Sequence, residues 1–312
     1  MKGHGGALGV AFQDANADGL VDVAVANDER PGDLFLNHAG RFEEIGAESG
    51  TAYDRQGRVH GGMGIDWTDF DGDGKPDLGV MTFTGEDKSL YRNVDGRFFE
   101  DVAWKWGLTG PMRVDIAFGF RFLDYDNDGQ PELMVTNGHI QENAREIRAE
   151  ESYEQPLRLF RNRGATLEPV GEGRWPLLVG RGLATGDLDN DGGTDAVVTN
   201  LEGRALLLRN VSPRGHWLGL QMDGRSPQAG GKSNRMGLGA RVRLKAGGRA
   251  QLRELHTAGS YMSASDGRLI LGLGDHETLD ELIVLWPSGK QTRAQVEGID
   301  RWMTIHEEKA AP

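Results

Sequence analysis

A short acidic segment occurs four times along the 312-residue chain, and this repetition restricts the fold more than any other feature of the sequence. The copies read DANADGLVD at 14–22, DFDGDGKPD at 69–77, DYDNDGQPE at 124–132 and DLDNDGGTD at 187–195. Their first residues, 14, 69, 124 and 187, are therefore 55, 55 and 63 positions apart. A regular period of this length is typical of a repeat architecture in which each repeat forms one structural unit.

Segments that favour β-strands surround each copy. A short apolar or glycine-rich run precedes it, a run such as VDVAVAND (21–28) follows it, and a further strand then ends in asparagine, as in DLFLN (33–37). In the first three repeats a turn and a fourth strand come next. Four short strands bounded by Gly, Asn and Asp are typical of a propeller blade. The sequence therefore predicts an all-β fold with about four blades in residues 1–212.

The longer third interval contains an insertion, HIQENAREIRAEESYEQP, at about 139–156. Its residues are highly charged and favour helix. We expect an exposed helical loop that projects from one blade, either as surface decoration or as a protrusion that binds a partner.

The 55-residue rhythm stops near His216, which predicts a separate, small β-sandwich-like domain at 213–312. A polar, glycine-rich linker is expected at 223–237. The expected strands are HWLGLQM (216–222), ARVRLKA (240–246), AQLRELHT (250–257), RLILGLG (268–274), LDELIVLW (279–286), KQTRAQV (290–296) and RWMTIHE (301–307).

The repeated segment has the residue types of a calcium-binding loop. Acids at positions 1, 3 and 5 point into a tight loop, a glycine at position 6 permits a sharp turn, and an acid at position 9 closes the cage. Ca²⁺ takes about six to eight such oxygen ligands, whereas softer metals prefer the His and Cys that these loops lack. A closed cage leaves no ligand position for a substrate, so the loops predict about four structural ions.

An EF-hand shares the start of this pattern but does not account for the rest. It needs a glutamate at position 12 and a helix on each side. Position 12 is valine in every copy, at Val25, Val80, Val135 and Val198, and the flanks favour strands. Polar Asp-Gly turns without an ion are the simpler alternative, and four matched copies disfavour it.

The distribution of charge supports a metal role. Residues 1–212 contain 21 Lys and Arg against 37 Asp and Glu, a net charge of −16, while residues 213–312 contain 14 against 11, a net +3. The four loops hold 15 of the 37 acids, so the remaining 22 nearly balance the 21 bases. The sequence has no basic stripe with interleaved aromatic residues, so it does not predict a nucleic-acid partner. It also has no apolar run long enough to predict a membrane span. The chain has no cysteine, which excludes disulfides and thiolate metal sites.

The four loops, with the strands and asparagines around them, resemble FG-GAP/VCBS repeats. The tail is similar to the ASPIC/UnbV domain in GLGARVRL (237–244), GSYMSASD (259–266), LGLG (271–274) and LIVLWPSGKQ (282–291). Together with VTNGHI (135–140), these segments resemble the cartilage acidic protein type family. That family has bacterial members, and the chain is similar to one of them. The resemblance implies a calcium-binding, integrin-α-like β-propeller followed by a small β-domain. It also implies an extracellular or periplasmic, cell-envelope location.

Carried over by position, the resemblance implies four ligand sets. They are Asp14, Asn16, Asp18 and Asp22; Asp69, Asp71, Asp73 and Asp77; Asp124, Asp126, Asp128 and Glu132; and Asp187, Asp189, Asp191 and Asp195.

The chain also departs from that family. Members usually carry more repeats and an export signal, whereas residues 1–10 have no apolar region of a signal peptide. The chain is therefore expected to be N-terminally incomplete. Blade faces left uncovered in such an arc are a route to self-association.

Composition and motifs favour a binding or adhesion module, with a protein or glycan ligand, over an enzyme. No G-x-S-x-G segment occurs, although Ser260, Ser263, Ser265 and His256 lie close in sequence. His256 is expected in a strand, facing solvent. The alternatives are a calcium-dependent polysaccharide lyase or hydrolase and a purely structural assembly unit. A pocket in which His, Tyr, Arg and a carboxylate converge at the propeller axis would favour the enzyme.

Overall fold

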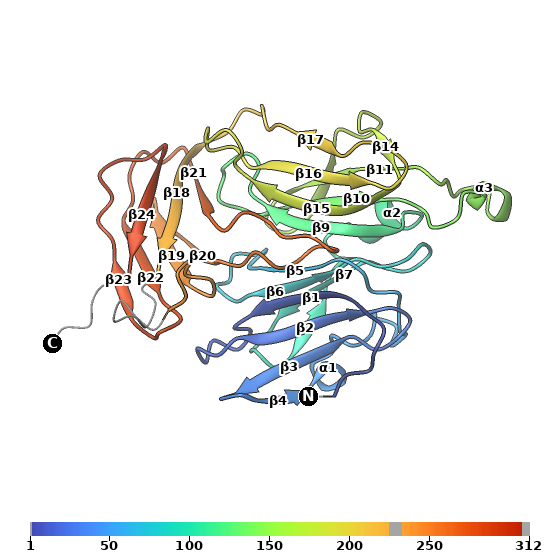
Figure 1. Ribbon diagram of the computed structural model, residues 1–312, viewed down its shortest axis with the longest axis horizontal. Coiled ribbons are helices and arrows are strands. Elements are labelled where there is room, and N and C mark those ends of the chain that lie inside the picture. Colours follow the sequence, from blue (N-terminus) through green and yellow to red (C-terminus); the bar gives the residue numbers. More distant parts are fainter. Residues whose placement is uncertain (1, 225–232, 308–312) are drawn as a thin grey trace.

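The computed structural model describes residues 2–224 and 233–307, and strands form nearly all of its regular structure. Four sheets lie side by side as a fan, and two further sheets stand at one end of that fan (Figure 1). This arrangement confirms the predicted all-β fold of blades followed by a sandwich-like unit. Residues 225–232 of the expected linker lie outside the described residues.

Each sheet of the fan is one blade, and its strands are antiparallel. The first three blades have four strands each, as predicted, and the fourth has three. Blade 1 contains β1 (Ala7–Gln13), β2 (Asp22–Asn27), β3 (Asp33–His38) and β4 (Arg41–Glu44); blade 2 contains β5 (Ile65–Thr68), β6 (Asp77–Val80), β7 (Ser89–Asn93) and β8 (Phe99–Asp101); blade 3 contains β9 (Ala117–Leu123), β10 (Glu132–Asn137), β12 (Arg158–Asn162) and β13 (Leu167–Val170); blade 4 contains β15 (Gly180–Gly186), β16 (Asp195–Asn200) and β17 (Leu206–Leu208).

Adjacent blades pack through small residues on one sheet and aromatic residues on the next. Ala24 and Ala26 of blade 1 share a core with Trp67 and Tyr91 of blade 2. Blade 3 approaches blade 2 so closely that a Cβ on Gly79 would lie 2.5 Å from Cζ of Phe120. The alternation of side chains along each strand therefore buries one face of a blade against its neighbour.

The four acidic loops all connect the first strand of a blade to the second. The residue before each loop pairs with its last residue, as in Thr68 with Asp77 and Leu123 with Glu132. Because the connection is the same in every blade, the loops gather at one end of the fan, next to the C-terminal sheets (Figure 1).

The C-terminal sheets enclose a separate core. One contains β21 (Leu269–Gly274), β18 (His216–Asp223) and β24 (Arg301–His306), and the other contains β20 (Arg249–Glu254), β19 (Arg241–Ala246), β22 (Glu281–Leu285) and β23 (Gln291–Arg293). The alternating residues Val242, Leu244, Leu282 and Val284 point into this core and are buried. These strands follow the predicted ones closely, while the domain boundary at 212/213 stays a prediction.

The insertion at 139–156 contains less helix than its composition favours. Its helix α3 (Ala144–Ile147) is a single turn, at a loop that projects from blade 3 (Figure 1). The segment ends in β11 (Gln155–Pro156), which pairs with β14 (Leu177–Leu178). The other helices, α1 (Gly46–Ser49) and α2 (Thr109–Met112), are equally short. None of the helices in the described part of the chain could span a bilayer.

Candidate metal centres and the facing pocket

All four acidic loops make the same backbone turn. The residues at positions 4 and 6 of each loop have a positive φ angle: Ala17, Gly72, Asn127 and Asn190 at position 4, and Gly19, Gly74, Gly129 and Gly192 at position 6. At position 6 the angle lies between 82° and 89°. Glycine reaches this conformation without the steric cost that a Cβ causes, so it serves the sharp turn as the sequence predicts.

Backbone N–H groups hold the first and ninth carboxylates of every loop. The N–H of position 6 donates to the first-position carboxylate over 2.9–3.0 Å. The N–H of position 2 donates to the ninth-position carboxylate over 2.9–3.1 Å. The loop backbone therefore places both acids before any ion binds.

In blades 2, 3 and 4, an asparagine at the end of the third strand or just after it joins the acidic loop of its own blade to that of the preceding blade. Its backbone N–H donates to the ninth-position carboxylate of its own blade, as in Asn93 to Asp77 over 2.7 Å. Its Nδ2 donates to a loop carbonyl of the preceding blade, as in Asn93 to Ala15 over 2.8 Å. Asn162 and Asn210 repeat this bond at 2.8 and 2.7 Å. The asparagines were visible in the sequence, but this role was not.

Three carboxylates converge in each of the second, third and fourth loops. One oxygen of each acid lies within 4.8 Å of the others, at positions 1, 3 and 9: Asp69, Asp71 and Asp77; Asp124, Asp126 and Glu132; Asp187, Asp189 and Asp195. The fifth-position acids Asp73, Asp128 and Asp191 lie outside these clusters, and the first loop forms no such cluster within residues 2–224. That all sixteen residues implied by the family resemblance bind an ion stays a prediction.

The clustered acids are buried and repel one another. Burial, together with the charge of Asp71, raises the pKa of Asp77 to about 8. In the third loop, burial and the nearby carboxylates raise the pKa of Glu132 to about 9. A nearby cation would oppose these shifts, because opposite charge favours the ionised form of an acid.

The third loop fits a hard divalent cation most clearly. Oδ1 of Asp124 and Oδ1 of Asp126 are buried and have no hydrogen-bond partner among the described residues. A buried carboxylate oxygen without a partner is costly. The donors are all oxygens, which is the ligand type that Ca²⁺ prefers. The residues present therefore fit calcium.

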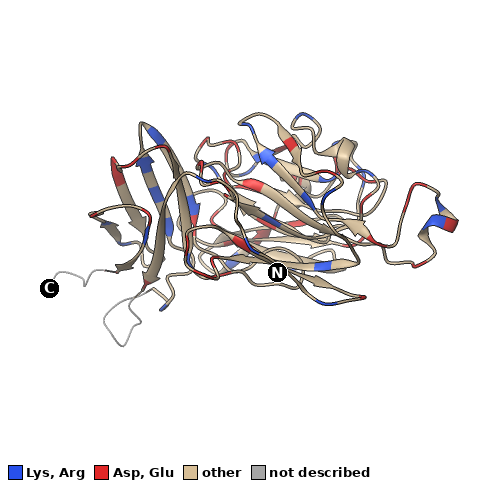
Figure 2. Cartoon of the chain, turned by 90° about the horizontal axis from the view of Figure 1, so that it is seen from above, with Lys and Arg blue, Asp and Glu red and all other residues tan. Residues whose placement is uncertain are grey.

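Arginines of the C-terminal sheets contact the acidic loops. Figure 2 shows Lys and Arg along several strands of those sheets. Arg241 Nη1 lies 2.9 Å from Asp14 Oδ2 of the first loop. Arg253 donates to the carbonyl of Gly129 over 3.0 Å. The acidic loops of the blades and the basic C-terminal sheets thus contact each other at one interface. The sequence alone did not predict this contact.

The serine-rich segment at 259–266 inserts between the blades and is not arranged for catalysis. Ser260 exchanges backbone hydrogen bonds with Ile65 of β5, at 2.7 and 3.4 Å. Its hydroxyl accepts the N–H of Phe120. Ser265 accepts the N–H of Thr185 from blade 4. The segment therefore contacts the first strands of three blades, and the hydroxyls of Ser260 and Ser265 accept hydrogen bonds from two of them.

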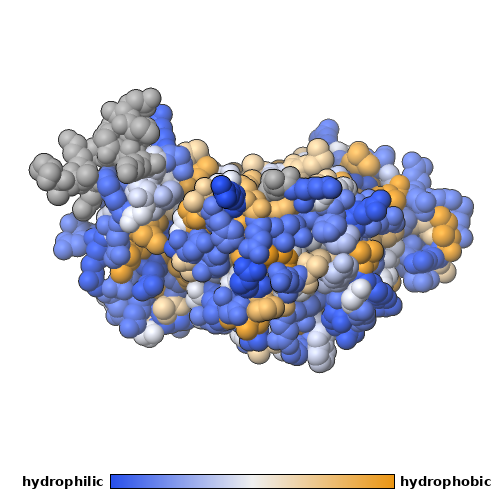
Figure 3. Space-filling view, turned by 90° about the horizontal axis from the view of Figure 1, so that it is seen from below, coloured by the Kyte–Doolittle hydropathy of each residue, from blue (hydrophilic) through white to orange (hydrophobic). Residues whose placement is uncertain are grey.

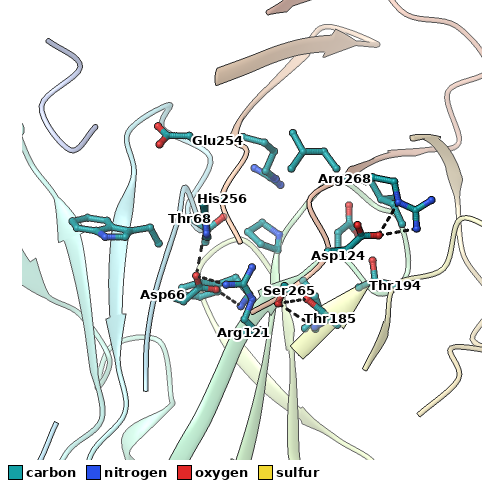
Figure 4. A pocket seen from close by; sticks show the side chains of 18 of the residues that line it. Asp66, Thr68, Arg121, Asp124, Thr185, Thr194, Glu254, His256, Ser265 and Arg268 are labelled. Atoms are coloured by element: carbon teal, nitrogen blue, oxygen red, sulfur yellow. Dashed lines mark hydrogen bonds and ion pairs between the residues drawn. The ribbon is translucent and has the colours of Figure 1, made fainter. Parts of the chain in front are cut away.

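A small pocket lies between the inner strands of the blades and the C-terminal sheets (Figure 4). Arg121 Nη1 donates to Asp66 Oδ1 over 2.9 Å, and the N–H of Phe122 donates to Asp66 Oδ2 over 3.0 Å. His256 Nε2 lies 3.9 Å from the same Asp66 oxygen. The free space is about 140 Å³, which is below the ~300–1,000 Å³ typical of ligand pockets.

The expectation that His256 faces solvent from within a strand is wrong. Strand β20 ends at Glu254, and the His256 side chain turns into the pocket, where it is 14% exposed. Its Nδ1 bonds to the carbonyl of Ala258 over 2.8 Å, which places the proton on Nδ1. Burial lowers the pKa of His256 from its ordinary value.

Three further histidines, two in the blades and one in β18, have separate partners. His60 contacts Tyr91, His139 contacts Glu151 and His216 contacts Asp300. No metal-holding cluster found between residues 2 and 307, outside the undescribed gap, contains any of the three. A cluster that sequence reasoning missed joins His4, Asp33 and Glu44 at the opposite end of blade 1, where Nδ1 of His4 lies 2.5 Å from Oδ1 of Asp33.

Comparison with known proteins identifies both parts of the chain. The family described as ASPIC and UnbV matches residues 230–312, and the FG-GAP-like repeat matches residues 14–80 and 69–135. Cartilage acidic protein 1 of Xenopus tropicalis is 29% identical over 96% of this chain and 44% of its own length. The human protein of that name is 28% identical over 93% of this chain and 42% of its own length. The chain thus spans less than half the length of these curated relatives.

Two solved structures resemble the chain weakly. A lectin of Agrocybe aegerita, described as recognising non-reducing terminal N-acetylglucosamine, gives a TM-score of 0.41 at 15% identity and covers 95% of this chain and 80% of that one. A rhamnogalacturonan lyase of Bacillus licheniformis gives a TM-score of 0.35 at 12% identity and covers 98% of this chain and 73% of that one. The sequence matches carry the assignment: the chain contains FG-GAP-like repeats and an ASPIC/UnbV domain and is homologous to cartilage acidic protein 1 over most of its length.

Proposed function

We propose that this chain is a calcium-stabilised blade module of an extracellular or cell-envelope protein, and that it binds a protein or glycan ligand. The observation that supports the proposal best is the convergence of three carboxylates in the second, third and fourth loops. Backbone hydrogen bonds hold the first and ninth of these acids in place, so the sites are preformed. The role of the ion is structural.

The loop residues account for how calcium would stabilise the blades. The clustered acids would hold the ion, which supplies positive charge among them and removes the cost of their mutual repulsion. The same ninth-position acids accept the backbone N–H of the linking asparagines, as Asp77 does from Asn93. Holding the acids ionised therefore strengthens the bonds between a loop and its blade, because hydrogen bonds to charged groups are stronger.

Homology to cartilage acidic protein 1 supports a location outside the cytoplasm. Calcium sites of extracellular modules have dissociation constants of roughly 10⁻⁴–10⁻³ M. Three carboxylates and a rigid backbone turn are a donor set suited to that range. The proposal therefore expects the sites to be filled outside the cell and largely empty in the cytoplasm.

The pocket supports ligand binding by a surface over catalysis in a cleft. Its free space of about 140 Å³ would not admit a disaccharide, and Arg121 and Asp66 neutralise each other inside it. A polymer or a protein would instead contact the exposed loops and strands, where propeller-type proteins carry their specificity.

A ligand screen with calcium and with EGTA tests this proposal. Arrays of glycans and of extracellular proteins would be probed with the whole chain in both buffers. We expect ligands whose binding is lost in EGTA and restored by added calcium. Asp71→Asn serves as a variant with a damaged site, and Glu142→Gln, which removes an exposed charge from the insertion, serves as its control. Equal binding in both buffers would refute calcium-dependent recognition.

One observation favours a second candidate, a polysaccharide lyase or hydrolase. His256, Arg121 and Asp66 converge in the pocket, where Nε2 of His256 and Nη1 of Arg121 both lie near Oδ1 of Asp66. A neutral histidine near a carboxylate is a suitable general base. Incubation with a panel of polysaccharides, followed by assay of reducing ends and of ultraviolet-absorbing unsaturated products, tests this candidate. Turnover by the wild-type chain that is lost in His256→Ala would establish it over the binding module.

A further inference from the structure

The first acidic loop differs from the other three in its third-position residue. Asn16 stands where the other loops have an aspartate. Its amide is committed to the loop, because Nδ2 donates to Asp18 Oδ2 and Oδ1 accepts the Asp18 N–H, each over 3.0 Å. None of the metal-holding clusters in the described residues includes Asp14, Asp18 or Asp22. The first loop therefore has the backbone turn of a calcium loop without its converging carboxylates.

A cationic side chain from the other end of the sequence contacts this loop. Arg241 begins strand β19, and its Nη1 lies 2.9 Å from Oδ2 of Asp14. The arginine side chain is 16% exposed and the aspartate side chain 5%, so the pair is largely removed from water. An arginine at this burial requires anionic partners, and its charge persists at any physiological pH.

A second carboxylate, that of Glu254, lies close to Arg241. Glu254 lies opposite Arg241 in the register of β19 and β20. Glu254 also accepts a hydrogen bond from Gln13 Nε2 over 2.7 Å, which brings it to the residue that precedes the first loop. Arg241 thus lies where an acid of blade 1 and an acid of the C-terminal sheets meet.

The other loops meet the C-terminal sheets in a different way. Arg253 and Arg268 donate to the backbone carbonyls of Gly129 and Asp187 in the third and fourth loops. In the fourth loop, Trp302 Nε1 also donates to Asp187 Oδ2 over 3.2 Å, and Arg209 of the same blade lies 2.6 Å from Asp189 Oδ2. In the third loop, Arg161 of the same blade pairs with Asp126, yet Oδ1 of Asp126 stays without a partner. Only in the first loop does an arginine of the described C-terminal sheets pair with the first-position acid.

We propose that Arg241 takes the place of the cation in the first loop. The chain then binds three calcium ions, in the second, third and fourth loops, and the first loop is the docking site of the C-terminal sheets on blade 1. The guanidinium charge beside Asp14 repels a divalent ion, and Asn16 removes one of the anions that would attract it. This inference rests on the proposed calcium binding of the other loops.

Calcium stoichiometry tests the inference. The whole chain would be stripped with chelator, dialysed against calcium, and assayed for bound calcium per chain by elemental analysis. We expect three ions for the wild type, three for Asp14→Asn and two for Asp69→Asn, which is the same change at the same position of the second loop. Four ions in the wild type, or loss of one ion in Asp14→Asn, would overturn the inference. No bound calcium at all would instead refute the proposed function.

A gain of binding tests the role of Arg241 itself. The double variant Asn16→Asp and Arg241→Gln restores the acid and removes the tethered cation, and we expect it to bind four ions. A count that stays at three in a folded double variant would overturn the role of Arg241. Thermal unfolding of Arg241→Gln alone gives an independent measure. Its loss of stability should be the same in calcium and in EGTA, whereas a loss confined to calcium would contradict the inference.

Discussion

At the scale of single residues, the acidic loops place buried carboxylates where each raises the pKa of the next. In the second loop, burial of Asp77 is reinforced by the charges of Asp71 and Asp69. Such an arrangement is costly without a cation, and a cation that binds only the folded chain stabilises it by linkage. The stability of the blades should therefore follow the calcium concentration.

We predict that Asp71→Asn lowers stability only when calcium is present. Asp71 is a clustered acid of the second loop, and asparagine retains its size while removing its charge. At calcium about 100-fold above the dissociation constant, one site adds about 2.7 kcal/mol, and the variant should lose about 1 kcal/mol or more of this, up to the whole. Thermal unfolding in calcium and in EGTA measures the effect. An equal loss in both buffers would exclude a metal role for this loop, and Glu142→Gln should change neither value.

His60 introduces a pH dependence that does not involve the loops. It is buried against the hydroxyl of Tyr91 at 3.2 Å, and burial lowers its pKa from 6.5 to about 4. Below pH 6.5 the unfolded chain takes up a proton that the folded chain does not. Stability must therefore fall as the pH falls from about 6.5 towards 4.

We predict that His60→Gln reduces this acid sensitivity. The free energy of unfolding of the wild type should fall by about 2 kcal/mol more than that of the variant between pH 7 and pH 5. Urea unfolding at both pH values in saturating calcium measures the difference. Parallel pH profiles for the two chains would show that His60 is not the group responsible.

At the scale of elements, an asparagine at the end of the third strand or just after it connects each of blades 2, 3 and 4 to the preceding blade. Asn93 donates to the carbonyls of Ala15 in blade 1 and Pro76 in blade 2, and all three groups are buried or partly buried. Asn37, the equivalent residue of blade 1, donates to Val21 within its own blade. The same residue type thus makes a bond between blades in one repeat and a local bond in another.

We predict that Asn93→Ala destabilises the chain by about 2–4 kcal/mol, because it leaves two buried carbonyls without a donor. Asn37→Ala, whose side chain is more exposed, should cost less than half as much. Denaturant unfolding of both variants in calcium provides the comparison. Similar losses would mean that the bond between blades contributes nothing beyond the local one.

At the scale of the whole molecule, the acidic ends of the blades and the basic C-terminal sheets form one interface. Arg253 and Arg268 bind backbone carbonyls of the third and fourth loops, so their contacts depend on the shape of those loops. Segment 259–266 then reaches from this interface to the first strands of blades 2, 3 and 4. Loss of loop structure should therefore loosen segment 259–266 as well.

We predict that chelation of calcium increases amide hydrogen exchange in segment 259–266 as well as in the loops. The increase should be at least about tenfold, corresponding to about 1.4 kcal/mol of lost local stability. Hydrogen exchange with mass spectrometry resolves the segments, and the core strands β19 and β22 are the internal control. Exchange that rises in the loops alone would show that the interface does not depend on loop shape.

The outer faces of the fan carry exposed apolar side chains. Val10 and Phe12 on β1 are 43% and 42% exposed, and Leu207 on β17 is 63% exposed. Figure 3 shows the underside of the molecule, on the side of blade 1, with apolar patches between hydrophilic residues. Self-association through these faces stays a prediction, and a concentration-dependent mass in light scattering that falls in Phe12→Ser would support it. A monomer at all concentrations would exclude it.

The sequence by itself determined the number of blades, their strands and the turn of each acidic loop, because these depend on residues close together along the chain. A period of about 55, alternating apolar residues and a glycine at position 6 are local signals. The tertiary structure decided which distant residues meet: Arg241 with Asp14, Asn93 with Ala15, and His256 with Asp66. Such contacts depend on how the blades and C-terminal sheets pack, and no local pattern encodes that packing. In sequence the first loop is set apart by Asn16, whereas its contact with Arg241 arises only in the folded chain.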